Sequence, residues 1–170
     1  ASLALSMESG GGFEIWQYTS RSTEKAKFNI QLGDYGLYAC RIKSRNVKES
    51  YHFFKKNNAD ILGELSLDPN GEETFFVKDP NGNIFNIVSG TGWFKDTKHP
   101  SKCGAVAGTM IGVSNIDESI ALYQGILGYE TIEYDKTGVF EDLSHLPKGD
   151  EKYRRVLLSH KENRKGPFAK

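Results

Sequence analysis

Cysteine is scarce in this sequence of 170 residues, long hydrophobic runs are absent, and neither sign of charge prevails. Cys40 and Cys103 are the only cysteines, and neither belongs to a CxxC pattern or has a histidine at metal-ligand spacing. We expect both to be free thiols, which suits a reducing cytoplasm.

The charge balance argues against nucleic acid and membrane as partners. Twenty-two basic residues are matched by 22 acidic ones, so no overall field favours phosphate backbones or anionic lipid. No run of about 18 apolar residues is present, and residues 1–7 are too short for a signal peptide and lack its basic flank. The length and the 38% hydrophobic content fit one globular domain or two small ones, and we expect a cytoplasmic location.

An internal repeat organises the chain. Residues 46–54 and 115–123 share their Asn, Glu and Ser and every apolar position, at an offset of 69 residues. Asn46 and Asn115 are suited to cap helices, and apolar residues recur at i, i+4 and i+7 behind them. Each predicted helix follows an apolar strand, at residues 37–44 and 107–114. Two modules therefore begin with a strand and a helix.

Further strands complete the first module. They are predicted at residues 60–67, 74–78 and 83–89, separated by turns of the sequence Asp-Pro-Asn-Gly at residues 68–71 and 79–82. The second helix leads to strands near residues 130–134 and 153–160. The sequence thus predicts an α+β fold with one whole βαβββ module.

The remaining segments indicate partial modules at both ends. Residues 3–6 resemble residues 156–159, and residues 13–18 fit a fourth strand. We expect the sequence to be part of a protein of three or four modules. The expected parts are the last two strands of a truncated module (residues 1–31), the complete module (33–90), a connector (91–103), and a further module lacking its fourth strand (104–170).

The order of these motifs resembles the vicinal oxygen chelate superfamily, which includes glyoxalases, bleomycin resistance proteins and extradiol dioxygenases. The resemblance rests on the Asn-capped repeat, on Leu127-Gly-Tyr129 after the second helix, and on Asp79-Pro-Asn-Gly-Asn83 before an apolar strand. Residues 13–17 are similar to the closing strand of that family. The resemblance implies βαβββ modules of the glyoxalase/bleomycin resistance/dihydroxybiphenyl dioxygenase fold, whose curled mixed sheets surround a cavity.

The resemblance also implies a divalent metal such as Zn, Ni, Mn or Fe, which acts on the substrate as a Lewis acid. Family members usually place a His in each first strand and a Glu in each fourth strand. Here Ala39 and Gly108 stand at the His positions, and Asn86 stands at one Glu position. Only Glu14 is a ligand of the expected type. We expect no metal cofactor in this chain, although residues outside it would be free to complete a site.

Strand alternation suggests which side chains line the expected cavity. Glu14 and Trp16 share one face of their strand, so Glu14 is a metal ligand, a general base, or a carboxylate that is solvated or paired with a basic residue. In the next module Leu37, Arg41 and Lys43 are expected to face the cavity with Ala39, while Tyr38, Cys40 and Ile42 lie under the helix.

Arg41 is the most informative of these candidates. Its guanidinium would hold a carboxylate or a phenolate, or it would form a salt bridge with Glu14. Asn86 would orient a polar group of the ligand or face water.

Two functions follow from the resemblance. The first is binding of a small organic molecule between modules without a complete metal site in this chain. The alternative is a metal-dependent lyase, isomerase or ring-cleaving dioxygenase completed by residues outside it. Because both ends leave strand edges open, we also expect residues 13–18 to pair with residues 153–160 within one chain, or by strand exchange in a homodimer.

Overall fold

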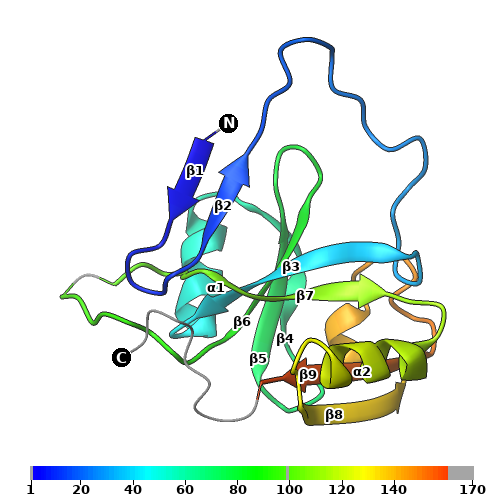
Figure 1. The fold of residues 1–170 in the computed structure, drawn as a ribbon. Coiled ribbons are helices and arrows are strands. Elements are labelled where there is room, and N and C mark those ends of the chain that lie inside the picture. The colour runs from blue at the N-terminus through cyan, green and yellow to red at the C-terminus, as the bar shows by residue number, and fades with distance from the viewer. Residues whose placement is uncertain (1, 99, 161–170) are drawn as a thin grey trace.

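The computed structural model describes residues 2–98 and 100–160, and these form an α+β fold with three separate sheets (Figure 1). The largest sheet has five strands in the order β4-β5-β6-β3-β7. Two antiparallel hairpins, β1–β2 and β8–β9, make up the other two sheets. The α+β class predicted from the sequence is confirmed.

The first repeat has the predicted order βαβββ. Its elements are β3 (Gly36–Ser44), α1 (Val47–Lys56), β4 (Asp60–Leu67), β5 (Glu73–Lys78) and β6 (Ile84–Ser89). Strand β6 lies between β5 and β3, antiparallel to β5 and parallel to β3. The βα connection carries the chain across the sheet, so that α1 covers one sheet face.

Helix α1 begins where the sequence predicts. The Asn46 side chain accepts a hydrogen bond of 2.9 Å from the backbone N–H of Glu49, and its amide group donates to the Glu49 carboxylate. This arrangement satisfies one of the free N–H groups of the first turn. The two Asp-Pro-Asn-Gly turns also form, because Gly71 and Gly82 adopt the left-handed backbone that these turns require.

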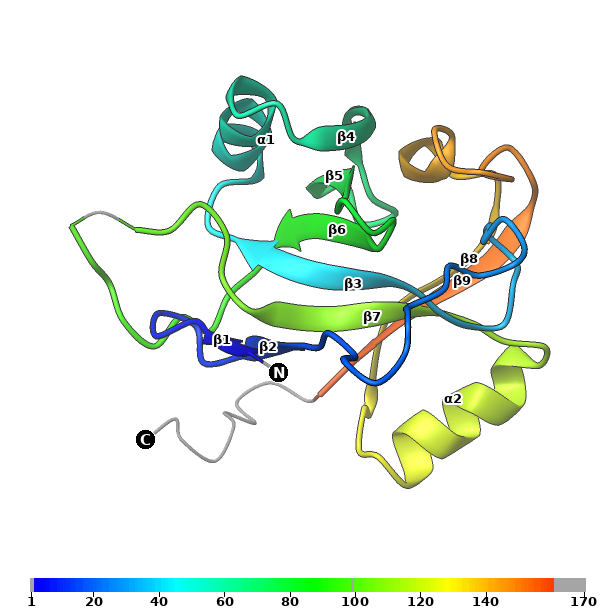
Figure 2. The same cartoon turned by 90° about the horizontal axis from the view of Figure 1, so that it is seen from above.

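The second repeat consists of β7 (Val106–Gly112), α2 (Ile116–Gly125), β8 (Thr131–Gly138), the short 3-10 helix η1 (Glu141–Leu143) and β9 (Tyr153–Ser159). Asn115 caps α2 as predicted, accepting from the backbone N–H groups of Asp117 and Glu118. Strand β7 pairs antiparallel with β3, so the first strands of the two repeats lie side by side (Figure 2). In Figure 2, α1 lies beyond β3 and α2 lies beyond β7, so the two helices flank this strand pair.

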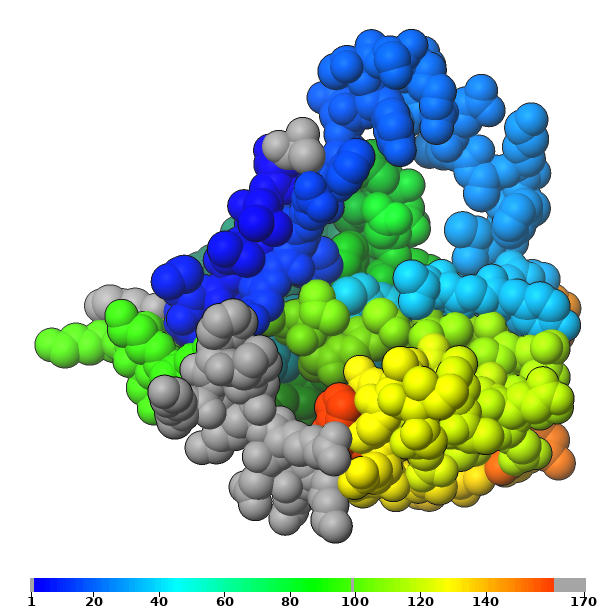
Figure 3. Space-filling view, viewed as in Figure 1, coloured from blue at the N-terminus to red at the C-terminus, as the bar shows by residue number. Residues whose placement is uncertain are grey.

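The N-terminal hairpin stands apart from the main sheet. Strands β1 (Ser2–Leu5) and β2 (Gly12–Ile15) pair only with each other among the described residues, and β9 pairs only with β8. The prediction that the two ends pair within one chain is therefore wrong for this part of the chain. The hairpin ends before Trp16, and the segment that follows it has no regular structure. Figure 3 shows this segment arching over the rest of the molecule, at the top of the view. Strand exchange between two chains stays a prediction.

Two hydrophobic cores lie on the two faces of the five-stranded sheet. On the outer face, Val47 and Tyr51 of α1 pack against the sheet residues Ile42, Phe75, Val77 and Ile87. The inner face, toward the β8–β9 hairpin, packs Tyr38, Ala39 and Phe76 against Phe140, Leu143 and Leu146. The predicted helical stripe of Val47, Tyr51 and Phe54 does contact the outer core. No helix in residues 2–98 and 100–160 is long and apolar enough to cross a membrane.

Candidate functional site

Polar side chains gather on the inner face of the five-stranded sheet. Arg41 of β3 and Asn86 of β6 are register partners in the parallel pair, so their side chains project from the same face. Asn86 is 1% exposed, and its amide nitrogen donates to Thr74 Oγ1 at 2.6 Å and to the Phe75 carbonyl at 3.3 Å. Arg41 and Asn86, two of the residues predicted to contact a ligand, are thus neighbours on one face of the sheet.

Arg41 is poorly satisfied for a buried cation. Its side chain is 12% exposed, its nearest carboxylate oxygen is that of Asp68 at 3.9 Å, and its Nε is buried without a hydrogen-bond partner. Burial lowers the pKa of the Arg41 guanidinium, and the negative charge of Asp68 acts in the opposite direction. The salt bridge forms with Asp68 at the end of β4, and Glu14 makes no ion pair within the described residues.

The β8–β9 layer adds a second charged pair close to Arg41. Asp142 of η1 is 3% exposed and accepts two hydrogen bonds of 2.8 Å, one on each carboxylate oxygen, from Nη1 of Arg155. Burial raises the pKa of Asp142, while Arg155 opposes that change. The Arg155 guanidinium also lies 5.3 Å from the ring centroid of Phe140 and 5.9 Å from that of Tyr134. Burial raises the Tyr134 pKa as well.

Four members of this cluster were not predicted from the sequence: Asp68, Tyr134, Asp142 and Arg155. Asp68 carried a usable signal, because it begins a turn directly after a predicted strand. Asp142 lies between the strands predicted near residues 130–134 and 153–160, and nothing local indicates that η1 folds back onto the inner face. Its partner Arg155 lies 13 residues further along the chain, on β9.

A β-bulge changes the predicted faces of β3. The register with β7 shifts between Leu37 and Ala39, and Tyr38 joins Ala39 in the inner core. The expectation that Tyr38 lies under the helix is therefore wrong. Its hydroxyl is buried without a hydrogen-bond partner, and burial raises the pKa of Tyr38 to about 12. Leu37, predicted to line the cavity, is 73% exposed.

Lys43 contacts the connector between the repeats. Its Nζ donates to the carbonyls of Thr91 and Gly92, at 3.3 and 3.0 Å, and lies 5.2 Å from the Trp93 ring centroid. Burial lowers the Lys43 pKa, with the Arg45 charge acting in the same direction. The connector thus provides the hydrogen bonds that a ligand would otherwise have to supply.

Glu14 and Trp16 lie apart from Arg41 and Asn86. Both are exposed, and Trp16 contacts only Tyr18 among aromatic rings in the described chain. Ala39 and Gly108 offer no donor atoms, and the Asn86 amide nitrogen is already engaged. In residues 2–98 and 100–160, no three His, Cys, Asp or Glu side chains lie close enough to hold a metal. The residues present do not fit the metal that the family resemblance implies.

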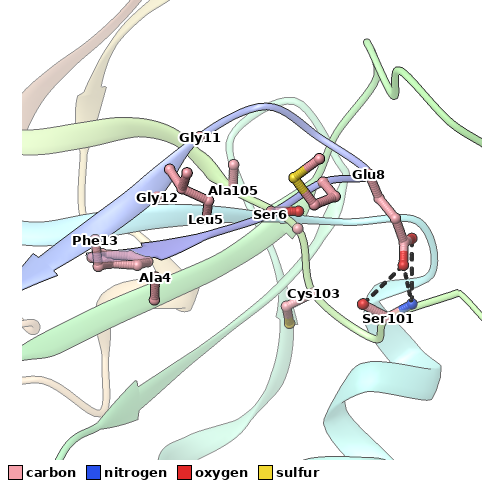
Figure 4. A pocket seen from close by; sticks show the side chains of 12 residues that line it. Ala4, Leu5, Ser6, Glu8, Gly11, Gly12, Phe13, Ser101, Cys103 and Ala105 are labelled. Atoms are coloured by element: carbon pink, nitrogen blue, oxygen red, sulfur yellow. Dashed lines mark hydrogen bonds between the residues drawn. The ribbon is translucent and has the colours of Figure 1, made fainter. Parts of the chain in front are cut away.

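Two clefts border the N-terminal hairpin. The larger, of about 600 Å³, lies on the outer face and is lined mainly by apolar residues, among them Phe13, Phe54, Phe85 and Cys103. The smaller, of about 410 Å³, separates β1–β2 from residues 101–105 (Figure 4). At its rim the Glu8 carboxylate accepts from the backbone N–H and hydroxyl of Ser101, at 3.1 and 2.9 Å. Neither cleft is lined by Arg41.

In comparisons with known proteins, no family model, no curated protein and no solved structure matches the chain.

Proposed function

We propose that this chain is a metal-free binding protein of the vicinal oxygen chelate kind, which holds a small organic anion against the inner face of its main sheet. Support for the family comes from the repeated strand and capped helix, with the first strands of the repeats paired antiparallel. The βαβββ order of residues 36–89 and the mixed pairing around β6 support the same assignment.

One observation carries the proposed ligand chemistry, namely the incomplete pairing of Arg41. A buried guanidinium has five N–H donors, and here Asp68 approaches only to 3.9 Å while Nε has no partner. Leaving a buried donor without a hydrogen-bond partner costs about 1–3 kcal/mol, and the cost is higher for a charged group. A carboxylate or phenolate on the ligand would supply the missing acceptors in the planar geometry that arginine favours.

The binding proposed here needs no metal. Three of the positions where the family resemblance implies ligands hold Ala39, Gly108 and Asn86, and Glu14 at a fourth is exposed, so Arg41 would supply the charge that neutralises the anion. We place this activity in a reducing cytoplasm, where the free thiols of Cys40 and Cys103 persist.

Calorimetric titration with 2-naphthoate and its uncharged analogue 2-naphthamide tests the proposal. We expect naphthoate to bind at least tenfold more tightly than naphthamide, which corresponds to about 1.4 kcal/mol. Arg41→Met should remove this preference. Arg45→Met is the matched control, because Arg45 pairs with Asp96 and stacks on Trp93 away from the inner face.

Equal affinities for the two compounds in the parent protein would refute the proposal. So would a preference that survives Arg41→Met while the variant keeps its circular dichroism spectrum.

A further inference from the structure

The connection between β8 and β9 is longer than its counterpart in the first repeat. Five residues, 68–72, join β4 to β5, whereas 14 residues, 139–152, join β8 to β9. We call residues 139–152 the η1 segment. Because both connections join the second and third strands of a repeat, the first repeat shows how short this hairpin loop can be. The additional residues of the η1 segment therefore need another explanation.

The η1 segment covers part of the inner face of the main sheet. Phe140, Leu143 and Leu146 are buried there, and Figure 2 shows η1, the orange coil, beside β4. Gly63 of β4 has a φ of 80°, and a Cβ at this position would overlap the His145 ring. Strand β4 is thus shaped to receive the segment, which rests on the face where we place the ligand.

The side chains of the η1 segment have the chemistry that we propose for the ligand. The Asp142 carboxylate accepts two hydrogen bonds of 2.8 Å from Arg155, and its neighbours Phe140 and Leu143 are apolar and buried. Arg155 lies near Arg41, because burial lowers the Arg41 pKa and the Arg155 charge adds to this effect. A carboxylate with apolar groups beside two guanidiniums is what an apolar carboxylic acid would present to this face.

The charge balance of the cluster argues against binding of a further anion while the η1 segment is in place. Two cations, Arg41 and Arg155, are matched by two anions, Asp68 and Asp142. A ligand carboxylate would give this buried cluster a net negative charge, which is costly where water is excluded. Departure of the segment removes Asp142, and the single positive charge that remains in excess matches a monocarboxylate.

The η1 segment leaves two polar groups of the inner face unsatisfied. Arg41 Nε and the Tyr38 hydroxyl are buried without a hydrogen-bond partner in the described chain. Each buried group of this kind is destabilising. A ligand that supplies an acceptor to Arg41 therefore gains an interaction that the segment does not make, and this gain favours exchange of the segment for the ligand.

We propose that the η1 segment occupies the anion site as an internal substitute for the ligand, and that the ligand is a monocarboxylate with an apolar body, which displaces the segment when it binds. This inference rests on the proposed function, because it concerns the same site. The site would stay closed until an anion of this class competes with Asp142 for Arg155.

Calorimetric titration of Asp142→Asn and Glu151→Gln with 2-naphthoate tests the displacement. Both variants replace one carboxylate of the η1 segment by an amide, but Glu151 is exposed and pairs with Lys148. We expect Asp142→Asn to bind naphthoate about tenfold more tightly than the parent, because a larger fraction of the variant is open. Glu151→Gln should bind like the parent, and circular dichroism checks that both variants are folded.

Hydrogen exchange of the parent gives a measure that needs no variant. The Leu32 N–H donates to the Pro147 carbonyl of the η1 segment at 3.2 Å, so this amide is released when the segment leaves. We expect it to exchange about fivefold faster in saturating naphthoate than in buffer.

The opposite results would show that the η1 segment closes over the ligand instead. Weaker naphthoate binding by Asp142→Asn, or unchanged or slower exchange at Leu32, would overturn the displacement. If Arg41→Met still removed the preference for naphthoate over naphthamide, the proposed function would stand without it. Absence of naphthoate binding from both the parent and Asp142→Asn would overturn both, whereas binding by Asp142→Asn alone would support the internal substitute.

Discussion

The buried pair of Asp142 and Arg155 provides the sharpest stability test of this fold. The Asp142 side chain is 1% exposed and that of Arg155 is 12% exposed, and the two bonds of 2.8 Å fix η1 on β9. Removing one partner of such a pair leaves an uncompensated buried charge, at a cost of about 3–5 kcal/mol. We expect Asp142→Ala to lower the free energy of unfolding by about 3 kcal/mol, because the faces of Phe140 and Tyr134 still stabilise the cation.

The double variant separates pairing from packing. Replacing both residues, as Asp142→Ala with Arg155→Met, removes both charges, so we expect it to be less destabilised than Asp142→Ala alone. Urea unfolding followed by circular dichroism compares the parent with Asp142→Ala, Arg155→Met and the double variant. The control is the exposed pair of Lys148 and Glu151, 2.8 Å apart, whose removal should leave the free energy of unfolding nearly unchanged because water screens the two charges. The reasoning would be refuted if the destabilisation of the double variant equalled the sum of the two single destabilisations within about 0.5 kcal/mol.

Two further predictions concern Cys103 and metal. Burial raises the pKa of Cys103 to about 11 from 9.0, so at pH 9 alkylation by iodoacetamide should be about fiftyfold slower than in the urea-unfolded chain, and should speed up as the pH rises toward 11. Mass spectrometry of the peptide that contains Cys103 measures the alkylation rate. A rate in the folded chain within threefold of that in the unfolded chain would contradict this prediction. Protein purified without chelator should contain only traces of zinc, nickel, manganese or iron. Near-stoichiometric metal that Glu14→Ala removes would revive the enzyme hypothesis.

Elements with strong local signals could be predicted from the sequence. The bounds of β4 agree with the prediction, since an apolar run there is closed by an Asp-Pro-Asn-Gly turn. Strand β8 was predicted to end at residue 134 but continues to Gly138. Its last residues are polar, and Asp135 is stabilised by two hydrogen bonds from Arg154 on β9. Such cross-strand pairing cannot be read from one segment alone.

The candidate site was predictable only where a strand kept its regular alternation. Arg41 and Asn86 share the inner face because β3 and β6 are in register there. Tyr38 and Leu37 were misplaced because a bulge inserts a residue opposite β7, and the sequence has no glycine or proline at that point to indicate it. The approach of η1 to the sheet is a tertiary contact, which a single sequence does not specify.

The hydrogen bonds around Asn86 explain why a carboxylate does not suit this position. Thr74 Oγ1 donates its only proton to the Ile87 carbonyl at 2.9 Å, so it can only accept from its neighbour. The Asn86 amide supplies that donor at 2.6 Å and also donates to the Phe75 carbonyl. A glutamate would place acceptor against acceptor in a region that excludes water, where an unpaired polar group costs about 1–3 kcal/mol. Asn86 therefore holds β5 and β6 together, and in the binding that we propose the anion would contact Arg41 and not Asn86.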